Sequence, residues 1–229
     1  LAVSYDMNNN WNFYANYAKG RRSPVVNADA SGVTVTKAEI VDSYDLGVKY
    51  QSPNFTFTGA VFTYQYSDYQ QSYTDAETLQ SITVTVGDST MSGIEGMATY
   101  HYSDTLSFTT SLGFLDAEFA DDTADGTPFQ YGGNKFRLAP EVSGAININK
   151  LVEMDNWLLD FNWLTSFQSK VYFESSNYPG LWQDTHSLTD VSMKVSKDNS
   201  QFAFEVYVDN LFDKEYLIDA GNTGGGLGI

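Results

Sequence analysis

The sequence lacks cysteine and has little positive charge. The absence of cysteine excludes disulfides, thiolate nucleophiles and cysteine-ligated metal sites. Only 12 lysine and arginine residues stand against 29 aspartate and glutamate residues, which gives a formal net charge of −17 at pH 7. Proteins that bind nucleic acid neutralise its phosphates with basic side chains. The charge balance therefore excludes nucleic acid as a partner.

The sequence also lacks any hydrophobic run of the roughly 18 residues that a membrane-spanning helix needs. Residues 1–20 have neither the basic start nor the apolar centre of a signal peptide. A β-barrel strand, by contrast, crosses a bilayer with about 9–11 residues, of which only every second one is apolar. An aromatic content of 15% is typical of strands and of the interfacial girdles of membrane barrels.

Apolar and polar residues alternate in many segments, as they do in a strand with one apolar and one polar face. In Gln201–Asp209, Phe202, Phe204, Val206 and Val208 share one face. The alternation recurs, with apolar phases over Trp11–Tyr17, Tyr44–Tyr50, Ile94–Tyr102, Leu106–Phe114, Val142–Ile148, Trp157–Trp163 and Val191–Val195. Leu1–Asp6 and Phe55–Tyr66 bring the prediction to about ten strands. The apolar phase of Phe55–Tyr66 slips near Gly59, which predicts a β-bulge there.

The predicted connections alternate in length. Short turns fall at Asn8–Asn10, Ser52–Asn54, Ser103–Asp104 and Lys197–Ser200, with a medium one at Lys150–Asn156. Long connections fall at Gly20–Lys37, Asp68–Ser89, Ala120–Lys135 and Glu174–His186, and alternation over Ile82–Val86 extends a strand into the second of them. Short turns on one rim and long loops on the other are typical of outer-membrane barrels. A soluble sandwich also alternates, but its strands are shorter.

Several motifs, in order along the chain, resemble those of TonB-dependent receptors. Residues 12–24 end in the corner Ala18-Lys19-Gly20-Arg21-Arg22-Ser23-Pro24, and Asp45-Leu46-Gly47-Val48-Lys49 resembles the strand that follows. Further matches are Phe62–Gln70, Ser92–Glu95, Leu138-Ala139-Pro140 and the C-terminal motif with Asn210, Leu211, Phe212, Asp213 and Tyr216. The Asn-Ala-Gly that often precedes the Ser92–Glu95 motif in the family is replaced here by Val86-Gly87-Asp88.

The resemblance implies an all-β fold, an antiparallel up-and-down transmembrane β-barrel with about ten strands of a plugged barrel of roughly 22. Residues 1–229 would then be the C-terminal half of the barrel, without the plug, the first barrel half and the last strand. The implied function is TonB-energised uptake of a ferric siderophore or another large scarce nutrient across the outer membrane of a Gram-negative bacterium. TonB would bind the absent N-terminal part, and the barrel would contact outer-membrane lipid and lipopolysaccharide.

Two pairs of residues are candidates for binding the ligand. Arg21 and Arg22 stand where a strand meets a long loop, and arginine pairs with carboxylates in a fork geometry. The alternative for them is a loop anchor or a lipopolysaccharide contact. Tyr69 and Tyr73 lie in a tyrosine-rich segment that would stack on a ligand or form part of an interfacial girdle.

The sequence predicts no catalytic residues, no metal site and no cofactor, and therefore no enzyme. Asp184 and His186 would share one face and His101 would face the lumen, so both histidines are interpreted as polar wall or rim residues.

A Ca²⁺ site is the alternative to a solvated exterior for the acidic residues Asp116, Glu118, Asp121, Asp122 and Asp125. A passive porin without a plug and an outer-membrane β-barrel enzyme are the alternative functions.

Overall fold

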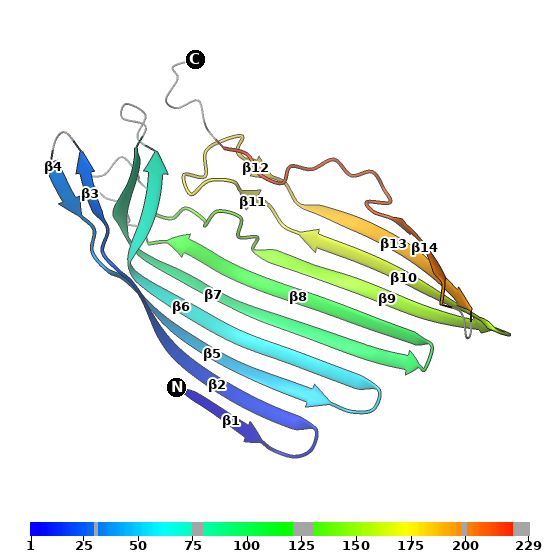
Figure 1. Ribbon diagram of the computed structural model, residues 1–229. Coiled ribbons are helices and arrows are strands. Elements are labelled where there is room, and N and C mark those ends of the chain that lie inside the picture. Colours follow the sequence, from blue (N-terminus) through cyan, green and yellow to red (C-terminus); the bar gives the residue numbers. More distant parts are fainter. Residues whose placement is uncertain (30–31, 75–79, 121–130, 198–200, 222–229) are drawn as a thin grey trace.

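The computed structural model describes residues 1–29, 32–74, 80–120, 131–197 and 201–221. Within these ranges, ten strands form one antiparallel sheet in the order β1-β2-β5-β6-β7-β8-β9-β10-β13-β14 (Figure 1). The strands are β1 Ala2–Asp6, β2 Trp11–Arg22, β5 Glu39–Gln51, β6 Phe55–Thr74, β7 Ser81–Ser103, β8 Leu106–Phe119, β9 Val142–Met154, β10 Trp157–Gln168, β13 His186–Lys197 and β14 Ala203–Val208. Each strand pairs with its neighbour in sequence, so the topology is up-and-down.

Two small hairpins lie outside this sheet. Each is inserted in the connection between two neighbouring strands of the sheet. One is β3 (Val26–Asp29) with β4 (Gly32–Val35), and the other is β11 (Val171–Tyr172) with β12 (Trp182–Gln183). Figure 1 shows the tight turns gathered along one edge of the curved sheet and both hairpins at the opposite edge. The predicted alternation of short and long connections is thus confirmed for the described residues. Residues 198–200 of the predicted turn Lys197–Ser200 and residues 121–130 of the predicted connection Ala120–Lys135 lie outside them. No helix of the described residues has the length and apolarity that crossing a membrane would require.

Two of the predicted connections are shorter than expected because the strands are longer. β9 continues to Met154 and β10 starts at Trp157, so the medium connection is a tight turn in which Asp155 adopts φ 52°. Most of the expected loop Asp68–Ser89 is strand, since β6 and β7 run on as a hairpin above the sheet. The alternation over Ile82–Val86 correctly indicated this extension.

The β-bulge predicted near Gly59 is wrong. Gly59 pairs with Val48 on one side and with Gly96 on the other, without a shift of register. The register shifts lie further along β6, between Tyr66 and Gln70. The change of apolar phase has another cause: Phe62, Tyr64 and Tyr66 lie on the face that carries the polar residues of the neighbouring strands.

Aromatic rings cover several strand glycines. A Cβ added at Gly93 would lie 2.6 Å from the carbonyl oxygen of Phe114 and 2.6 Å from the Phe62 ring. A Cβ at Gly144 would lie 2.5 Å from the Ser111 carbonyl oxygen and 2.8 Å from the Phe167 ring. Each ring comes from the residue that pairs with the glycine across the strands. A ring therefore occupies the space that a side chain would fill at these two positions.

Alanine at Gly93 is expected to destabilise the folded protein by about 1–3 kcal/mol, because a backbone oxygen and a packed ring both block its methyl group. Gly113→Ala is the matched control: its added Cβ would meet nothing closer than 3.5 Å. Urea unfolding of the complete protein in lipid vesicles measures both effects. Equal stability of the two variants would contradict the assigned packing.

Candidate functional site

The cross-strand register gives the sheet one apolar and one polar face. Ala15, Leu46, Val61, Ile94, Phe114 and Val142 form one continuous row across six strands. Leu46 is 58% exposed, Ile94 57% and Phe114 50%. These apolar side chains point away from the protein and are not sealed in a dry interior. Such exposure over a whole face is compatible with a lipid environment.

The tight-turn edge of the apolar face carries a band of aromatic rings. The Trp11 and Tyr50 ring centroids are 4.6 Å apart, and those of Tyr50 and Phe55 are 6.0 Å apart. Further along this edge, the Lys197 ammonium lies 5.6 Å from the Trp157 ring centroid. Amphipathic rings beside a cation are typical of the boundary between hydrocarbon and headgroups. This edge therefore has the character of a membrane interface.

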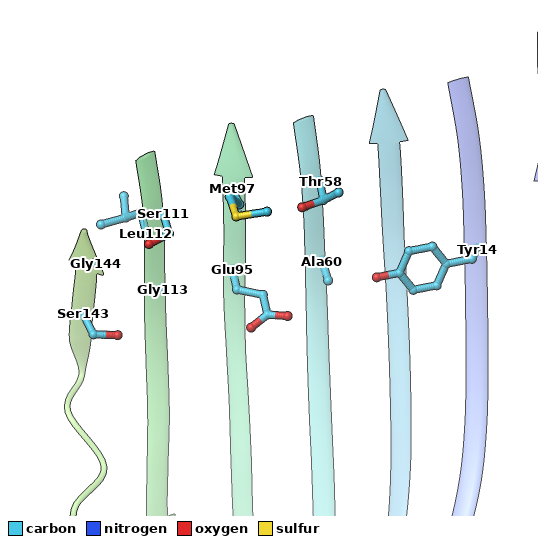
Figure 2. Close-up of a pocket in the computed structure, with 12 residues that line it drawn as sticks. Tyr14, Thr58, Ala60, Glu95, Met97, Ser111, Leu112, Gly113, Ser143 and Gly144 are labelled. Atoms are coloured by element: carbon cyan, nitrogen blue, oxygen red, sulfur yellow. The ribbon is translucent and has the colours of Figure 1, made fainter. Parts of the chain in front are cut away.

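The opposite face is a polar wall. Figure 2 shows a hollow on it that reaches from β2 to β9, with the Tyr14 ring extending towards the strands that carry Ala60 and Glu95. Polar side chains pair across the strands: the hydroxyls of Thr99 and Thr109 are 3.0 Å apart, and Asn147 donates to Asn162 at 3.1 Å. A hollow spanning this many strands marks the concave side, which is the lumen side of a barrel wall.

Arg21 and Arg22 lie on opposite faces. Arg22 pairs with Glu39 on the lumen side, and Arg21 pairs with Ile40 on the apolar side. The Arg22 guanidinium donates to the carbonyl oxygen of Gln70 at 3.3 Å and lies 3.9 Å from the Glu39 carboxylate. Strand alternation alone separates the two neighbouring arginines. The sequence interpretation treated them as one pair, although the alternation was already visible.

Gln70 ends one of the motifs matched in the sequence, but the sequence interpretation gave it no role. Its side chain is 3% exposed and donates to the carbonyl oxygens of Ser23 and Lys37, while its backbone N–H donates to Glu39 at 2.7 Å. Within the described residues its Oε1 has no hydrogen-bond partner. Gln70 thus ties the ends of β2, β5 and β6 together at the long-connection edge. The Phe62–Gln70 motif marked this position, although it did not indicate which groups the side chain contacts.

Tyr69 belongs to a small aromatic core at the long-connection edge. Its ring centroid lies 5.7 Å from that of Phe119 and 5.5 Å from that of Phe136. The buried members of this outer core are Val86, Ala117, Phe119, Tyr131 and Phe136. Burial raises the pKa of the Tyr131 phenol, with a smaller contribution from Glu174. The backbone of Tyr73 pairs with Ile82 at the end of the β6–β7 hairpin, and its side chain is not among those described.

The outer core and the β3–β4 hairpin both pack on the β6–β7 extension. Asn27 of β3 donates to the Thr83 carbonyl at 2.7 Å and accepts from the Thr83 N–H at 3.1 Å. Thr85 accepts from the Lys37 N–H, whereas Val84 and Val86 belong to the outer core. The long connections thereby form one packed cluster at this edge.

Lys135 lies among acidic side chains at the end of β8, two of which, Asp116 and Glu118, were considered as Ca²⁺ ligands. The Lys135 ammonium lies 2.7 Å from Asp116, 3.3 Å from Glu118 and 3.2 Å from Glu141. Hydrogen bonding to Asp116, with help from the other two carboxylates, raises the pKa of Lys135 against the opposing effect of burial. Among the described residues no His, Asp and Glu group has a geometry that would hold a metal ion. Asp121, Asp122 and Asp125 lie outside the described residues.

Asp184 and His186 do not pair through the carboxylate. The His186 Nδ1 lies 3.2 Å from the backbone oxygen of Asp184, and the ring stacks on Tyr216 with centroids 5.0 Å apart. The side chain of His186 is buried. His101 pairs with Ser107 on the polar face, as predicted. A stacked imidazole with a backbone contact fits a packing role for His186.

Comparison with known proteins identifies the family. The family model described as TonB dependent receptor-like, beta-barrel, matches residues 1–211. The chain belongs to the TonB-dependent receptor β-barrel family. The resemblance seen in the sequence, the all-β barrel fold and the location in the bacterial outer membrane are thereby confirmed.

Similar proteins include the pesticin receptors of Yersinia pestis and Yersinia enterocolitica, each 23% identical over 222 residues. Among solved structures, the ferric yersiniabactin uptake receptor FyuA of Yersinia pestis aligns with a TM-score of 0.78 at 23% identity. The alignment covers 32% of the FyuA chain and 94% of the present chain. The ferric preacinetobactin receptor BauA of Acinetobacter baumannii aligns with a TM-score of 0.73 at 18% identity. The alignment again covers 94% of the present chain and 32% of the other. The chain spans about a third of the length of these relatives.

The C-terminal motif of this TonB-dependent receptor barrel forms a hydrogen-bonded turn. Asn210 adopts φ 51°, its side-chain amide donates to the Lys214 carbonyl at 3.0 Å, and its Oδ1 accepts from the Lys214 N–H at 2.8 Å. The Asp190 carboxylate accepts from the Asn210 N–H at 2.8 Å, which fixes the turn to β13. Beyond the turn, Tyr216 reaches His186. The motif therefore directs the chain away from β14 and over the upper part of β13.

Asn210→Ala is expected to destabilise this turn by about 1–3 kcal/mol. It removes two hydrogen bonds, and alanine is disfavoured in the left-handed backbone conformation that position 210 adopts. Asn210→Gly removes the same hydrogen bonds, but glycine adopts the left-handed conformation readily. This variant should therefore lose less stability than Asn210→Ala. Hydrogen exchange at the Asp213 amide reports both effects, because its donation to the Asn210 backbone carbonyl at 2.8 Å does not depend on the side chain. Unchanged protection in Asn210→Ala would show that the side chain does not hold the turn.

Proposed function

We propose that these 229 residues are the C-terminal half of the barrel of a TonB-dependent outer-membrane receptor for a ferric siderophore or another large, scarce nutrient. The family match over residues 1–211 supports this, as does the coverage of about a third of each relative. The plug, the first barrel half and the last strand belong to the rest of the polypeptide. TonB binds the N-terminal part, and outer-membrane lipid and lipopolysaccharide surround the barrel.

The observation that carries the proposal is a wall with a lipid-compatible apolar face, a polar lumen face and a packed loop cluster at one rim. The apolar face holds the barrel in the membrane. Backbone pairing between neighbouring strands satisfies the polar backbone groups of the strands inside the sheet, as hydrocarbon requires. The lumen face offers hydroxyls, amides and Glu95 to a plug or a passing ligand. The chain's own residues thus provide binding surface and enclosure rather than bond-breaking chemistry.

Of the four ligand-binding residues predicted from the sequence, Arg22 has the most suitable position. It lies on the lumen side at the loop rim, where its side chain is 50% exposed. A guanidinium there meets an anionic ligand before the ligand enters the barrel. Tyr69 contributes from within the outer core, and the backbone of Tyr73 lies further along the β6–β7 hairpin, where it pairs with Ile82. Arg21 points to the opposite, apolar face, where it pairs with Ile40.

Uptake by the full-length receptor tests the function. Cells that carry it as their sole receptor should accumulate iron supplied as a radiolabelled ferric siderophore, and should lose this uptake when TonB is deleted. Arg22→Gln should lower uptake several-fold, while Arg21→Gln should not. The siderophores named for the relatives, ferric yersiniabactin and ferric preacinetobactin, are the first ligands to try.

The same assay separates the alternatives. Uptake that persists without TonB would favour a passive porin. Hydrolysis of outer-membrane substrates that is lost on replacing Asp184 and His186 together would favour an enzyme. The buried, stacked position of His186 speaks against the latter.

A further inference from the structure

The β3–β4 hairpin turns an apolar face away from the protein. Val26 pairs with Val35 and Ala28 pairs with Val33, so these four side chains share one side of the hairpin. Val26 is 63% exposed, Val33 67% and Val35 62%. Antiparallel strands with one solvated side normally place their polar residues on that side. In this hairpin the arrangement is reversed, and the four side chains form an open valine face.

The polar side of the hairpin is bound to the protein and fixes this orientation. Asn27 takes the place of a neighbouring strand at Thr83, since its side chain donates to the Thr83 carbonyl and accepts from the Thr83 N–H. At the base of the hairpin, the Val25 N–H donates to the hydroxyl of the buried Thr36 at 2.7 Å. Turning the valines inward would break these hydrogen bonds. The exposure of the valine face is therefore specified by the contacts on the other side.

The outer connections pack on one another in a row along the loop rim. Asn27 joins the β2–β5 connection to the β6–β7 extension, and Tyr69 of that extension packs on Phe136. Asn134 in turn donates to the Ser175 carbonyl, between β11 and β12, at 2.9 Å. Figure 1 shows β3 and β4 at one end of this row, with the β6–β7 extension between them and β11–β12. Because the two sides of a hairpin point in opposite directions, the valine face points away from the β6–β7 extension.

In the proposed receptor, the next member of this row comes from the polypeptide that precedes β1. β1 pairs with β2 and runs towards a tight turn, so the connection that enters β1 lies at the loop rim. The relatives are about three times as long as the present chain, which provides such a connection. Lipid is a poor occupant, because the hairpin lies between the charged residues Arg22 and Lys37, beyond the end of β2.

We propose that the valine face binds the outer connection that enters β1 from the preceding barrel strand, through apolar side chains of that connection. Covering the face removes three exposed valines from water, which favours the contact. The row of packed connections then continues from this half of the barrel into the other half. The proposal rests on the proposed function, because it takes the chain as the C-terminal half of a receptor barrel.

Cysteine labelling of the full-length receptor on intact cells tests the proposal, with a membrane-impermeant maleimide as the probe. Residues 1–229 contain no cysteine, and any cysteine elsewhere in the receptor is first replaced by serine. Val33→Cys is the test variant. Tyr178→Cys is the matched control, since Tyr178 belongs to another outer connection and is 55% exposed.

Two further receptors identify the occupant. One carries Val33→Cys and has the connection before β1 shortened to a tight turn. The other combines Val33→Cys with Val26→Ser and Val35→Ser, which leaves that connection in place but weakens its apolar contact. A heat-modifiability gel confirms that each barrel is folded.

In the otherwise unaltered receptor, Val33→Cys should be labelled at least ten-fold more slowly than Tyr178→Cys. Shortening the connection should bring the two rates together, and the serine substitutions should raise the Val33→Cys rate several-fold. Equal rates in the unaltered receptor would overturn the proposal. So would slow labelling that persists after shortening, because lipid, ligand or a second copy would then cover the face.

The serine variant decides alone if the shortened receptor does not fold, and an unchanged slow rate in it would also overturn the proposal. Iron uptake by the same cells separates this proposal from the proposed function. A freely labelled valine face in a receptor with normal TonB-dependent uptake contradicts the contact and leaves the transport function standing. Uptake that does not depend on TonB contradicts the transport function instead.

Discussion

Replacing Leu112 by arginine is expected to unfold most of the full-length protein under conditions that leave half of the unaltered protein folded. Leu112 lies in the middle of β8 on the apolar face and is 42% exposed there. An arginine on the lipid-facing side of a barrel costs about 2–4 kcal/mol near the bilayer midplane. The folded fraction is read from the faster gel migration of unheated barrels in lipid vesicles, at the urea concentration that unfolds half of the unaltered protein. It should fall at least ten-fold there.

Ser111→Arg is the control for this experiment. Ser111 is the adjacent residue on the lumen face and lines the same hollow as Glu95, so a cation there meets water and a carboxylate. Its folded fraction should stay close to that of the unaltered protein. If both arginines impaired folding to the same extent, the assignment of the two faces would be wrong.

Phe119→Ala is expected to open the loop cluster. Phe119 is 2% exposed, and its ring lies 4.5 Å from Phe136 and 5.4 Å from Tyr131, measured between centroids. Truncating a buried phenylalanine costs about 3–5 kcal/mol. The cluster should therefore unfold locally while the barrel wall persists, because none of these contacts lies in the membrane-facing rows.

Hydrogen exchange measures this effect at the Phe136 amide, which donates to the Ala117 carbonyl at 3.1 Å and should lose protection by several orders of magnitude. Phe212→Ala makes the same truncation at a side chain that is 69% exposed, and should leave that amide protected. Equal protection in the two variants would mean that the outer core does not hold residues 131–139 against β8.

The ten strands of the large sheet, their order and most of their faces followed from the sequence because a period of two is a local signal. Short-range alternation predicted Leu106–Phe114 as one face of a strand, and β8 confirms it. The loop cluster did not follow, because the contact of Tyr69 with Phe136 joins residues 67 positions apart and depends on tertiary packing. The Phe62–Gln70 motif marked Gln70, but its contacts with the carbonyl oxygens of Ser23 and Lys37 could not be predicted, because they join residues that are distant in the sequence.

The expected bulge at Gly59 failed for an instructive reason. Aromatic residues were assumed to face lipid, but Phe62 and Tyr64 stack on each other at 5.3 Å on the lumen side. There Phe62 lies against Gly93, and the Tyr64 hydroxyl donates to Asp45 at 3.2 Å. A large ring on a polar face needs a flat partner or an acceptor, and both come from neighbouring strands. The confusion therefore came from treating aromatic and apolar as the same property.

The rings that lie over Gly93 and Gly144 have an evolutionary consequence. If the ring at position 62 shrinks, the space above position 93 opens, and a side chain there is no longer excluded on that flank. Substitutions at 62 and 93, and likewise at 167 and 144, should consequently co-vary among relatives. Such compensated pairs would trace the neighbour relations of the wall in aligned sequences, without any coordinates.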